Sequence, residues 1–387
     1  MQTRWGAIVA IWFAGLCAAG QFAKVATVFE SLGPLWPGAG AGAGLGLIVS
    51  VVGAVGIVFG STAGIAVARL GARRMLVGAL IAGAALSAVQ AVGLPFGLML
   101  ATRLVEGFAH LSIVVAGPVL IAGAAAPKDQ AAAMTLWSTF FGLAFSITAA
   151  FGIPFAASHG PGALWALHGA LMLAAAALVW RVLPPEAAVA GAPLRLGALL
   201  ADHAAIYASP RIGAPAMGFV FYTMIFVAVL TLAPGLVAPR FHAITATVTP
   251  LLSIASSLGI GVQLTRRLGA VRTVEIGFAI GALAALLWGL STGALQVAAV
   301  FLMSAGLGFA QGASFAAIPE LNPTAEGRAK AAGAVAQLGN VGTTLGTPLL
   351  LALVGAFGAP AITLFTLPLC LGGIAMHLWL GARRARQ

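Results

Sequence analysis

Apolar stretches of about eighteen residues or more recur along the whole chain, and each is long enough to cross a lipid bilayer as a helix. Lipid offers backbone groups no hydrogen-bond partners, so helices are the only open structures that can span it. Only 7% of the 387 residues are charged, whereas soluble domains carry about 25%. We therefore predict an all-α polytopic membrane protein.

Charged residues and clusters of glycine and proline divide the apolar sequence into twelve predicted spans. The first six are predicted at 5–31, 44–68, 74–93, 96–121, 130–157 and 161–183. The other six are predicted at 212–238, 243–265, 273–291, 294–318, 329–356 and 359–382. The first stretch resembles a secretory signal, but it continues almost to Phe29, so we expect an uncleaved helix.

Lysines and arginines lie almost entirely on one side of the predicted membrane. Arg240 falls in a loop on the other side, and Lys24 and Arg103 fall inside spans. The remaining sixteen are Arg4, Arg69, Arg73, Arg74, Lys128, Arg181, Arg195, Arg211, Arg266, Arg267, Arg272, Arg328, Lys330, Arg383, Arg384 and Arg386. The positive-inside rule predicts that both termini are cytoplasmic. It also explains the net charge of +11 without a nucleic-acid partner, and we expect a multi-pass protein of a bacterial inner (plasma) membrane.

One long polar break, at 184–211, separates six spans from six. We predict a cytoplasmic linker there, an N-terminal six-helix bundle at 1–183 and a C-terminal six-helix bundle at 212–387. The two parts also share short motifs.

The motif "ARLGARR" at 68–74 recurs as "RRLGAVR" at 266–272, and "GFAH" at 107–110 recurs as "GFAQ" at 308–311. Both matches appear in the same order at an offset of about 200 residues, which indicates a duplicated six-helix unit.

These features resemble the major facilitator superfamily of secondary transporters over the whole chain. The family's loop signature after helix 2 is met by Gly64, Arg69, Gly71, Arg73 and Arg74, although Ala68 stands where the family has an aspartate. Its helix 4 signature, Arg-x-x-x-Gly, is met by Arg103 and Gly107. The resemblance implies two pseudo-symmetric six-helix bundles, alternating access, and cytoplasmic gate loops that include Gly64, Arg69, Gly71, Arg73 and Arg267. Within the family, helix 4 is loosely similar to that of cyanate-permease-like transporters.

Three ionisable residues, Arg103, Glu106 and His110, interrupt the fourth apolar span. An ionised group inside a membrane costs a few kcal/mol, so it normally faces a cavity or a partner. At about 100° per residue the three side chains share one helix face within about 60°. The resemblance implies that helices 1, 4, 7 and 10 line the central path, which would place this face toward a solute.

Helix 1 adds Gln21 and Lys24 on one stripe. Two cations and one carboxylate at similar depth leave a positive excess that suits an anionic solute. We predict that Gln21, Lys24 and Arg103 contact the solute and that Glu106 carries a coupled proton. Structural pairing of either cation with Glu106 remains the alternative, and His110 is either a proton relay or substrate ligand or a hydrogen-bonded core residue.

The second six spans contain polar but uncharged candidates. Buried amides need hydrogen-bond partners, so we predict that Gln311, Gln337 and Asn340 bind the solute, together with Tyr222 in the middle of helix 7. The first half would then hold the anion and the second would determine specificity.

No motif indicates an enzyme, a cofactor or a metal site. The glycine-rich stretch at 38–46 does not satisfy GxGxxG, and there is no P-loop. We therefore predict a monomeric secondary transporter for a small anionic solute, coupled to protons, with the bilayer as its other partner. The alternatives are a proton-coupled exporter of hydrophobic or cationic compounds and a non-transporting assembly or sensor protein of the same fold.

Overall fold

The computed structural model describes residues 2–26, 28–37, 43–185 and 199–386. In these residues it contains helices and no strand, and twelve segments are long and apolar enough to span a membrane. The predicted all-α, twelve-span architecture is confirmed.

Four of the first six spans are the single helices α1 (Trp5–Ala26), α2 (Ala43–Leu70), α3 (Ala72–Ala91) and α4 (Phe96–Ala124). The fifth span consists of α5 (Gln130–Ser138), α6 (Phe140–Ile147) and α7 (Ile153–His159), and the sixth is α8 (Pro161–Val182). The other six are formed by α10 (Ala214–Leu236), the pair α11 (His242–Ser256) and α12 (Val262–Leu268), α13 (Ala270–Leu290), α14 (Ala294–Leu321), α15 (Ala325–Phe357) and α16 (Ala361–Arg384).

Two spans that the sequence predicts as continuous, at 130–157 and 243–265, are interrupted. A π-helical turn at Thr148–Gly152 lies between α6 and α7, and another at Ser257–Gly261 lies between α11 and α12. Such a turn inserts an extra residue without ending the helix, so the apolar pattern does not reveal it.

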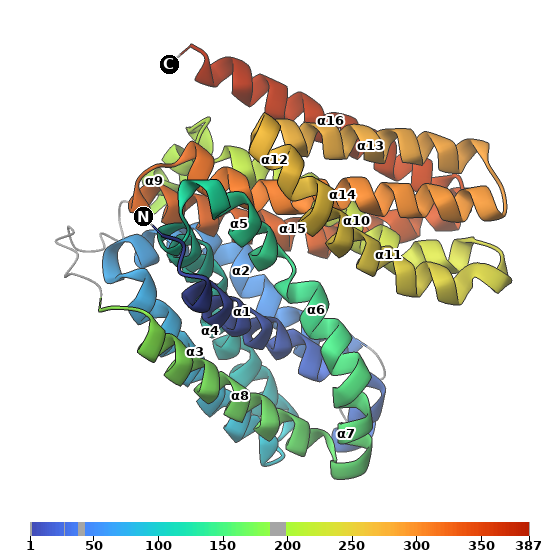
Figure 1. Cartoon of the computed structure of the whole chain (residues 1–387). Helices are drawn as coiled ribbons and strands as arrows, with labels where there is room; N and C mark the ends of the chain where they lie inside the picture. Colours follow the sequence, from blue (N-terminus) through green and yellow to red (C-terminus); the bar gives the residue numbers. More distant parts are fainter. Residues whose placement is uncertain (1, 27, 38–42, 186–198, 387) are drawn as a thin grey trace.

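The helices form two groups, α1 to α8 and α10 to α16, which we call the first half and the second half (Figure 1). The halves touch mainly where α2 packs along α15 and α5 packs against α14. The chain between the halves ends in the short helix α9 (Leu199–Ala208). The limits predicted for the N-terminal bundle (1–183), the linker (184–211) and the C-terminal bundle (212–387) stay a prediction. Residues 186–198 of the predicted linker, with Arg195, and residues 38–42 of the glycine-rich stretch lie outside the described residues.

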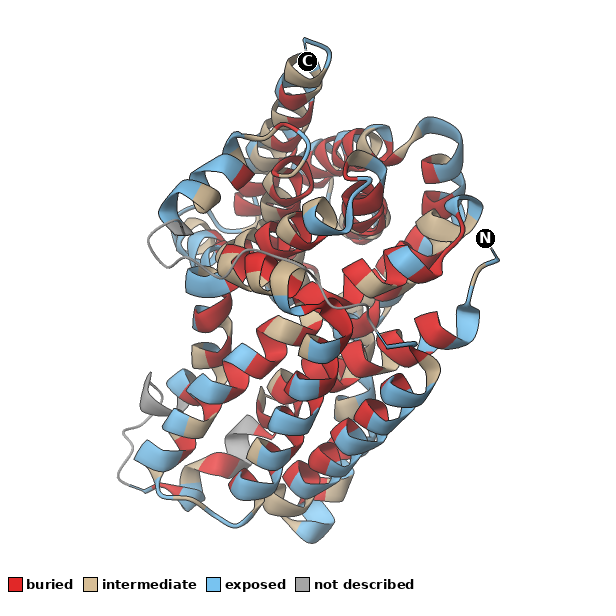
Figure 2. Ribbon diagram, turned by 90° about the vertical axis from the view of Figure 1, so that its left-hand side faces the viewer, coloured by how far each residue is buried: buried red, intermediate tan, exposed pale blue. Residues whose placement is uncertain are grey.

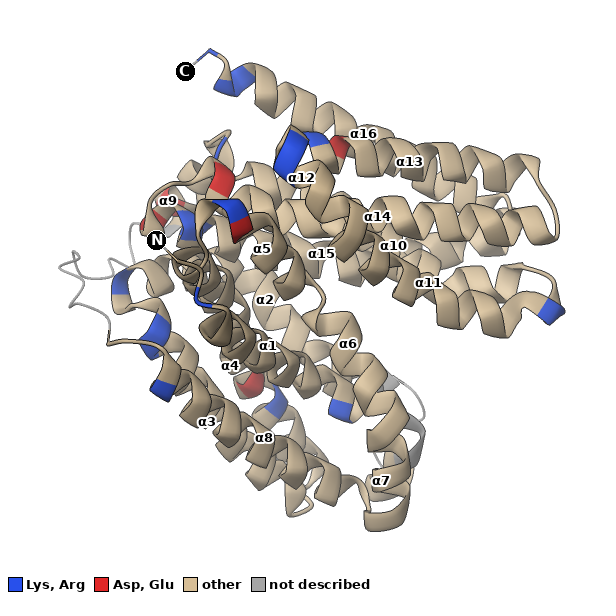
Figure 3. Cartoon of the chain, viewed as in Figure 1, with Lys and Arg blue, Asp and Glu red and all other residues tan. Residues whose placement is uncertain are grey.

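The two ends of the molecule differ in charge. Both chain termini and most lysines and arginines lie at one end, which we call the basic end (Figure 3). The connections that follow α1, α3, α7, α10, α13 and α15 lie at the opposite, far end. The halves are close together at the basic end, and the helices diverge toward α7 and α11 (Figure 1).

The duplicated loop motif folds alike in both halves. Gly71 begins α3 with φ of 94°, and Gly269 begins α13 with φ of 85°. This left-handed backbone favours glycine because a Cβ atom would be strained there. The predicted gate glycine Gly71 therefore has a local structural reason to be glycine.

The second duplicated motif also has matching contacts. A Cβ atom on Gly107 of α4 would lie 2.9 Å from the carbonyl oxygen of Val52 on α2. A Cβ atom on Gly308 of α14 would overlap the carbonyl oxygen of Ser253 on α11. In each half, glycine thus lets the fourth helix approach the second helix closely, as expected for a duplicated unit.

Buried residues gather where helices of one half face one another, and exposed residues lie on the outside (Figure 2). Large apolar residues such as Trp180, Ile260 and Leu283 are at least 60% exposed. Soluble proteins rarely expose broad apolar patches, so this outer surface is suited to lipid.

Candidate functional site

Glu106 on α4 is the centre of a buried group of charges. Its Oε1 accepts a hydrogen bond of 2.6 Å from Nζ of Lys24 on α1. Its Oε2 accepts one of 2.5 Å from Nη1 of Arg103. No side chain of the three is more than 2% exposed. We call Lys24, Arg103 and Glu106 the ion cluster, and this pairing is what allows three ionised groups to lie inside an apolar helix bundle.

Polar residues of α3 that the sequence analysis did not single out complete the hydrogen bonds of the ion cluster. Nζ of Lys24 also donates to Oγ of Ser87 at 2.7 Å and to Oε1 of Gln90 at 2.8 Å. Nε2 of Gln90 donates to Oε2 of Glu106 at 2.9 Å. All three protons of the ammonium group therefore have acceptors. A single serine and a single glutamine in an apolar helix form no pattern that would have revealed this role.

His168 on α8 extends the network in one direction. Its Nε2 lies 2.8 Å from the carbonyl oxygen of Cys17, and its Nδ1 lies 2.9 Å from Oγ of Ser87. A carbonyl only accepts, so Nε2 carries the proton of the neutral ring and Nδ1 accepts from the serine. Hydrogen bonds thus run from Lys24 through Ser87 to His168.

The ion cluster holds one positive charge in excess, because it contains two cations and one carboxylate. Arg103 also donates from Nη1 to the carbonyl of Gln21 at 2.7 Å and from Nε to the carbonyl of Ile48 at 2.9 Å. Its Nη2 has no hydrogen-bond partner in the described chain, and neither has the side-chain amide of Gln21. Gln21 and Lys24 therefore both lie inside the first half. Lys24 belongs to the ion cluster, and Gln21 lies beside it.

Lys24 and Arg103 do not reach a solute path in this conformation. They are 1% and 0% exposed, and residues of the first half surround them. The arrangement agrees with the alternative left open above, structural pairing with Glu106. Their direct contact with a solute stays a prediction.

The surface where the two halves meet, which we call the seam, brings three other residues together. Nδ1 of His110 bonds to the carbonyl of Ala18 at 3.0 Å, and its ring meets that of Phe22 edge-on at 4.9 Å. A Cβ atom on Gly53 of α2 would lie 3.9 Å from the Phe22 ring and 3.3 Å from Oδ1 of Asn340 on α15. His110 and Asn340 thus both lie near Phe22, and Nε2 of His110 makes no hydrogen bond with the described residues.

Aromatic rings continue along the seam from Phe22. The Phe141 ring on α6 lies 5.9 Å from it and is 37% exposed. The next residue, Gly142, is near the second half, because a Cβ atom there would lie 3.8 Å from Ile254 on α11. The sequence did not point to Phe22 or Phe141, since phenylalanine in a span is ordinary.

Two predicted residues of the second half have different surroundings. Tyr222 on α10 lies between Phe219 and Phe226, with ring centroids 5.2 and 5.3 Å away, and its hydroxyl makes no hydrogen bond with the described residues. Nε2 of Gln311 donates across the seam to the carbonyl of Ser138 at 2.7 Å. Gln311 therefore joins the halves, whereas Tyr222 belongs to an aromatic stack.

Gln337 also joins the halves, nearer the basic end. Its Oε1 accepts hydrogen bonds from Oγ of Ser61 on α2 at 2.5 Å and from the hydroxyl of Tyr207 on α9 at 2.6 Å. A Cβ atom on the nearby Gly64 would lie 2.6 Å from the carbonyl of Ala329 on α15. Gly64 therefore lets α2 lie close to α15, and its gate role stays a prediction.

The predicted arginines of the gate loops make unequal contacts. Arg69 pairs with Asp202 of α9 at 3.7 Å, whereas Arg73 donates to the carbonyl of Trp180 on α8 at 3.0 Å and so turns away from the seam. Arg267 is exposed. Its neighbour Arg266, which the sequence did not distinguish, faces Asp129 of the first half at 3.6 Å. Their gate roles stay predictions.

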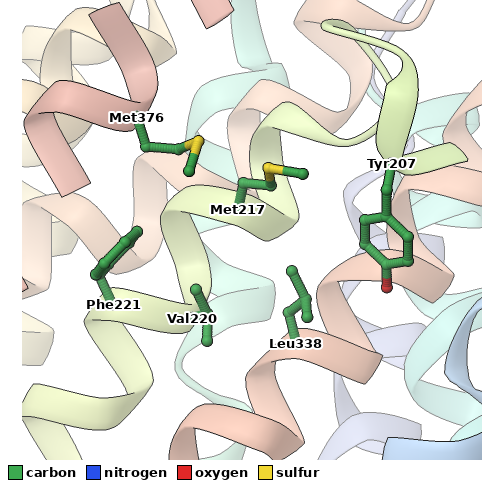
Figure 4. Close-up of a pocket in the computed structure, with 6 residues that line it drawn as sticks. All are labelled: Tyr207, Met217, Val220, Phe221, Leu338 and Met376. Atoms are coloured by element: carbon green, nitrogen blue, oxygen red, sulfur yellow. The ribbon is translucent and has the colours of Figure 1, made fainter. Parts of the chain in front are cut away.

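An apolar pocket of about 270 Å³ adjoins α9 at the side of the second half. It is lined by Tyr207, Met217, Val220, Phe221, Leu338 and Met376 (Figure 4). Its lining offers a charged solute no polar group except the hydroxyl of Tyr207, which already donates a hydrogen bond to Gln337 at the seam. Within the described residues, no group of three or more His, Cys, Asp or Glu side chains is placed to hold a metal ion.

Residues 7–326 match the Major Facilitator Superfamily. No curated protein matches the sequence, but the fold is similar to that of several solved transporters. The human organic anion transporter MFSD10 (TETRAN) is 16% identical, with a TM-score of 0.76 over 96% of this chain and 99% of that one. FucP in its outward conformation is 16% identical, with a TM-score of 0.74 over 95% and 98%. The proton:xylose symporter XylE is 15% identical, with a TM-score of 0.73 over 98% and 95%. The chain belongs to the Major Facilitator Superfamily and has the twelve-span fold of its transporters.

Proposed function

We propose that this protein is a proton-coupled secondary transporter that moves a small organic anion across the membrane by alternating access. The observation that carries the proposal is the single excess positive charge of the ion cluster, buried close to the seam. The concentration of arginine and lysine at the basic end supports a cytoplasmic location for that end. We place the protein in a bacterial inner membrane on the same basis.

The distribution of contacts along the seam supports an outward-facing state. The described hydrogen bonds and ion pairs between the halves lie at or toward the basic end, and they include those of Gln337, Gln311 and Arg266. The helices diverge at the far end (Figure 1). With a cytoplasmic basic end, a solute would enter from outside, and transport would require the seam to open inward. The similarity to FucP in its outward conformation agrees with this assignment.

The charge of the ion cluster favours an anion in the seam. Glu106 is one helical turn from His110 on α4, so the cluster lies close to any solute that touches that histidine. A unit charge about 10 Å away contributes roughly 1–2 kcal/mol at an effective dielectric constant of 20. Glu106 is bonded to two cations and so is poorly placed to anchor a cation. The name of the similar organic anion transporter is consistent with this substrate class.

Aromatic rings favour a solute with an apolar body. Phe22 and Phe141 lie along the seam in the first half, and Tyr222 is a candidate from the second half. Rings of this kind offer apolar area with few rotatable bonds. His110 and Asn340 would bind the polar end of the solute.

The arrangement of charges favours Lys24 over Glu106 as the group that exchanges the coupled proton. If Lys24 releases a proton, Arg103 and Glu106 remain as a neutral pair. If Glu106 gains one, two buried cations remain without a counterion, which is far more costly. An anion in the seam would favour protonated Lys24, and its departure would favour proton release through Ser87 and His168. Such linkage couples the two fluxes.

Reconstituted protein in liposomes with a trapped pH indicator tests the proposal. Aromatic and aliphatic carboxylates, added outside, should acidify the interior, and lipophilic cations should not. An exporter exchanges its cation for a proton, so alkalinisation of the interior by lipophilic cations alone would move the cation exporter to first place. A folded protein that moves neither class would instead be a non-transporting member of the family.

A further inference from the structure

Three arginines line a hollow at the basic end that contains no residue of the ion cluster. The pocket has a volume of about 560 Å³ and lies where the ends of α1, α3 and α8 meet. Its walls include Arg4, Arg73 and Arg181, together with Trp180 and residues 182–185.

Hydrogen bonds to the last turn of α8 fix two of these arginines. Nη2 of Arg4 donates to the carbonyl of Val182 at 2.5 Å, and Nη2 of Arg73 donates to the carbonyl of Trp180 at 3.0 Å. The Arg73 guanidinium also lies 4.3 Å from the centroid of the Trp180 ring. These bonds satisfy carbonyls at a helix end, but the neutral carbonyl that Arg4 contacts does not balance the charge of its guanidinium.

The pocket therefore concentrates positive charge. Among the described ion pairs, none joins an acidic side chain to Arg4 or Arg181. Both arginines are exposed, so an anion can reach them. A simple role as helix caps would explain Arg4 but would not require Arg181 beside it.

The pocket lies at the end of the spanning helix α8, where lipid headgroups are expected. Trp180 is in the last turn of a spanning helix and is 60% exposed, and tryptophan favours the membrane interface. Leu173 and Leu178 on α8 are 53% and 41% exposed, so an apolar surface leads from the pocket toward the membrane interior.

We propose that this pocket binds the headgroup of an anionic phospholipid. Arg4 and Arg181 would donate charge-assisted hydrogen bonds to its phosphate, and its acyl chains would lie along the exposed leucines of α8. Free phosphate offers the same anion without the chains. The lipid would join the ends of α1, α3 and α8 and so stabilise the first half.

Native mass spectrometry and thermal unfolding in detergent, with phosphatidylglycerol, phosphatidylcholine or inorganic phosphate added, test this site. Phosphatidylglycerol should remain bound and raise the unfolding temperature, and its affinity should fall at least tenfold in Arg4→Gln/Arg181→Gln. Arg181 makes no hydrogen bond in the described chain, so Arg181→Gln alone keeps the fold and should weaken binding at least threefold. The control, Arg74→Gln/Arg386→Gln, removes the same charge from exposed positions at the same end and should bind like the parent.

Three results would overturn the proposal. An equal loss in the control variant would mean that only net charge matters. Equal binding of phosphatidylcholine would remove the role of the anionic headgroup. Equal stabilisation by inorganic phosphate would identify a soluble anion in place of a lipid.

Discussion

Gln337 on α15 donates a hydrogen bond of 2.7 Å from its side-chain nitrogen to the carbonyl oxygen of Ile57 on α2. Its oxygen accepts from Ser61 and Tyr207, so one amide links α2, α15 and α9 at the basic end. Alternating access requires the seam to open, and these bonds must then break in every cycle. The seam and the ion cluster are separate structures, and variants can test them separately.

Replacing Gly64 by valine should prevent closure of the seam. A Cβ atom there would lie 2.6 Å from the carbonyl oxygen of Ala329 and 3.2 Å from the Cα atom of Gly333, and backbone cannot move aside as a flexible side chain can. We expect transport to fall about tenfold or more, since roughly 1.4 kcal/mol suffices for that factor. Ser61 is buried in the parent. A cysteine introduced there (Ser61→Cys) should react faster with a thiol reagent added from the basic end in the Gly64→Val background than in the parent background.

Gly78→Val on α3 is the matched control, because a Cβ atom at Gly78 has nothing within 4 Å. It should leave transport and labelling unchanged. Slow labelling of Ser61→Cys in the Gly64→Val background, equal to that in the parent background, would show that close packing of α2 on α15 does not hold the seam shut.

Tyr207→Phe should loosen the same seam without adding bulk. Loss of the hydrogen bond to Gln337 should cost about 1 kcal/mol, which is roughly a fivefold increase in the open population and in the labelling rate of Ser61→Cys. Burial raises the pKa of Tyr207 above its ordinary value of 10.0, so the hydroxyl stays protonated and its contribution is lost only as the pH rises above that range. We therefore expect the ratio of labelling rates to be constant between about pH 5 and pH 9. Equal labelling rates with and without Tyr207→Phe would show that the Tyr207 hydroxyl does not help to hold the seam closed.

Stability should respond very differently to the loss of each partner in the ion cluster. Glu106→Gln leaves Lys24 and Arg103 as buried cations without a counterion and should destabilise the protein by about 3–5 kcal/mol. Lys24→Met leaves the Arg103–Glu106 pair intact but removes the donor from Ser87, Gln90 and Glu106, so the loss should be smaller, about 1–3 kcal/mol. Thermal unfolding in one detergent measures both. Equal losses would contradict the view that Glu106 balances two charges.

The twelve spans and the duplication could be predicted from the sequence, because a backbone in lipid must form helices long enough to cross the bilayer. Even the glycines of the duplicated motifs could be aligned, and Gly107 and Gly308 have the expected matching contacts. The helical turns of α4 likewise put Arg103 and Glu106 on one face. The periodicity of a helix determines which residues share a face.

Periodicity does not determine which neighbour covers that face, and the candidate site was harder to predict for this reason. Glu106 meets Gln90 of α3 inside the first half, whereas His110, one turn further along α4, meets Phe22 at the seam. Partners such as Ser87 and His168 lie on other helices, far away in the sequence, in spans that are otherwise mostly apolar. Only the packing of the helices brings them together.

His110→Gln should keep both the fold and proton coupling. Glutamine can donate to the carbonyl of Ala18, much as Gln311, at the equivalent position of the second half, donates to Ser138. If Lys24 exchanges the proton, removing the histidine ring leaves that group in place. Anion-driven acidification in liposomes should then persist, with the affinity for the anion reduced about tenfold or less by the loss of one polar contact.

Lys24→Met supplies the opposite result in the same assay. Without the ammonium group the ion cluster has no excess charge and no proton to release, so a pH gradient should no longer drive uptake against a concentration gradient. Exchange of labelled for unlabelled anion, which needs no net proton movement, should continue at reduced affinity. If His110→Gln abolished acidification while Lys24→Met retained it, the proton would pass through the seam and not through the ion cluster, and the chain from Lys24 through Ser87 to His168 would have only a structural role.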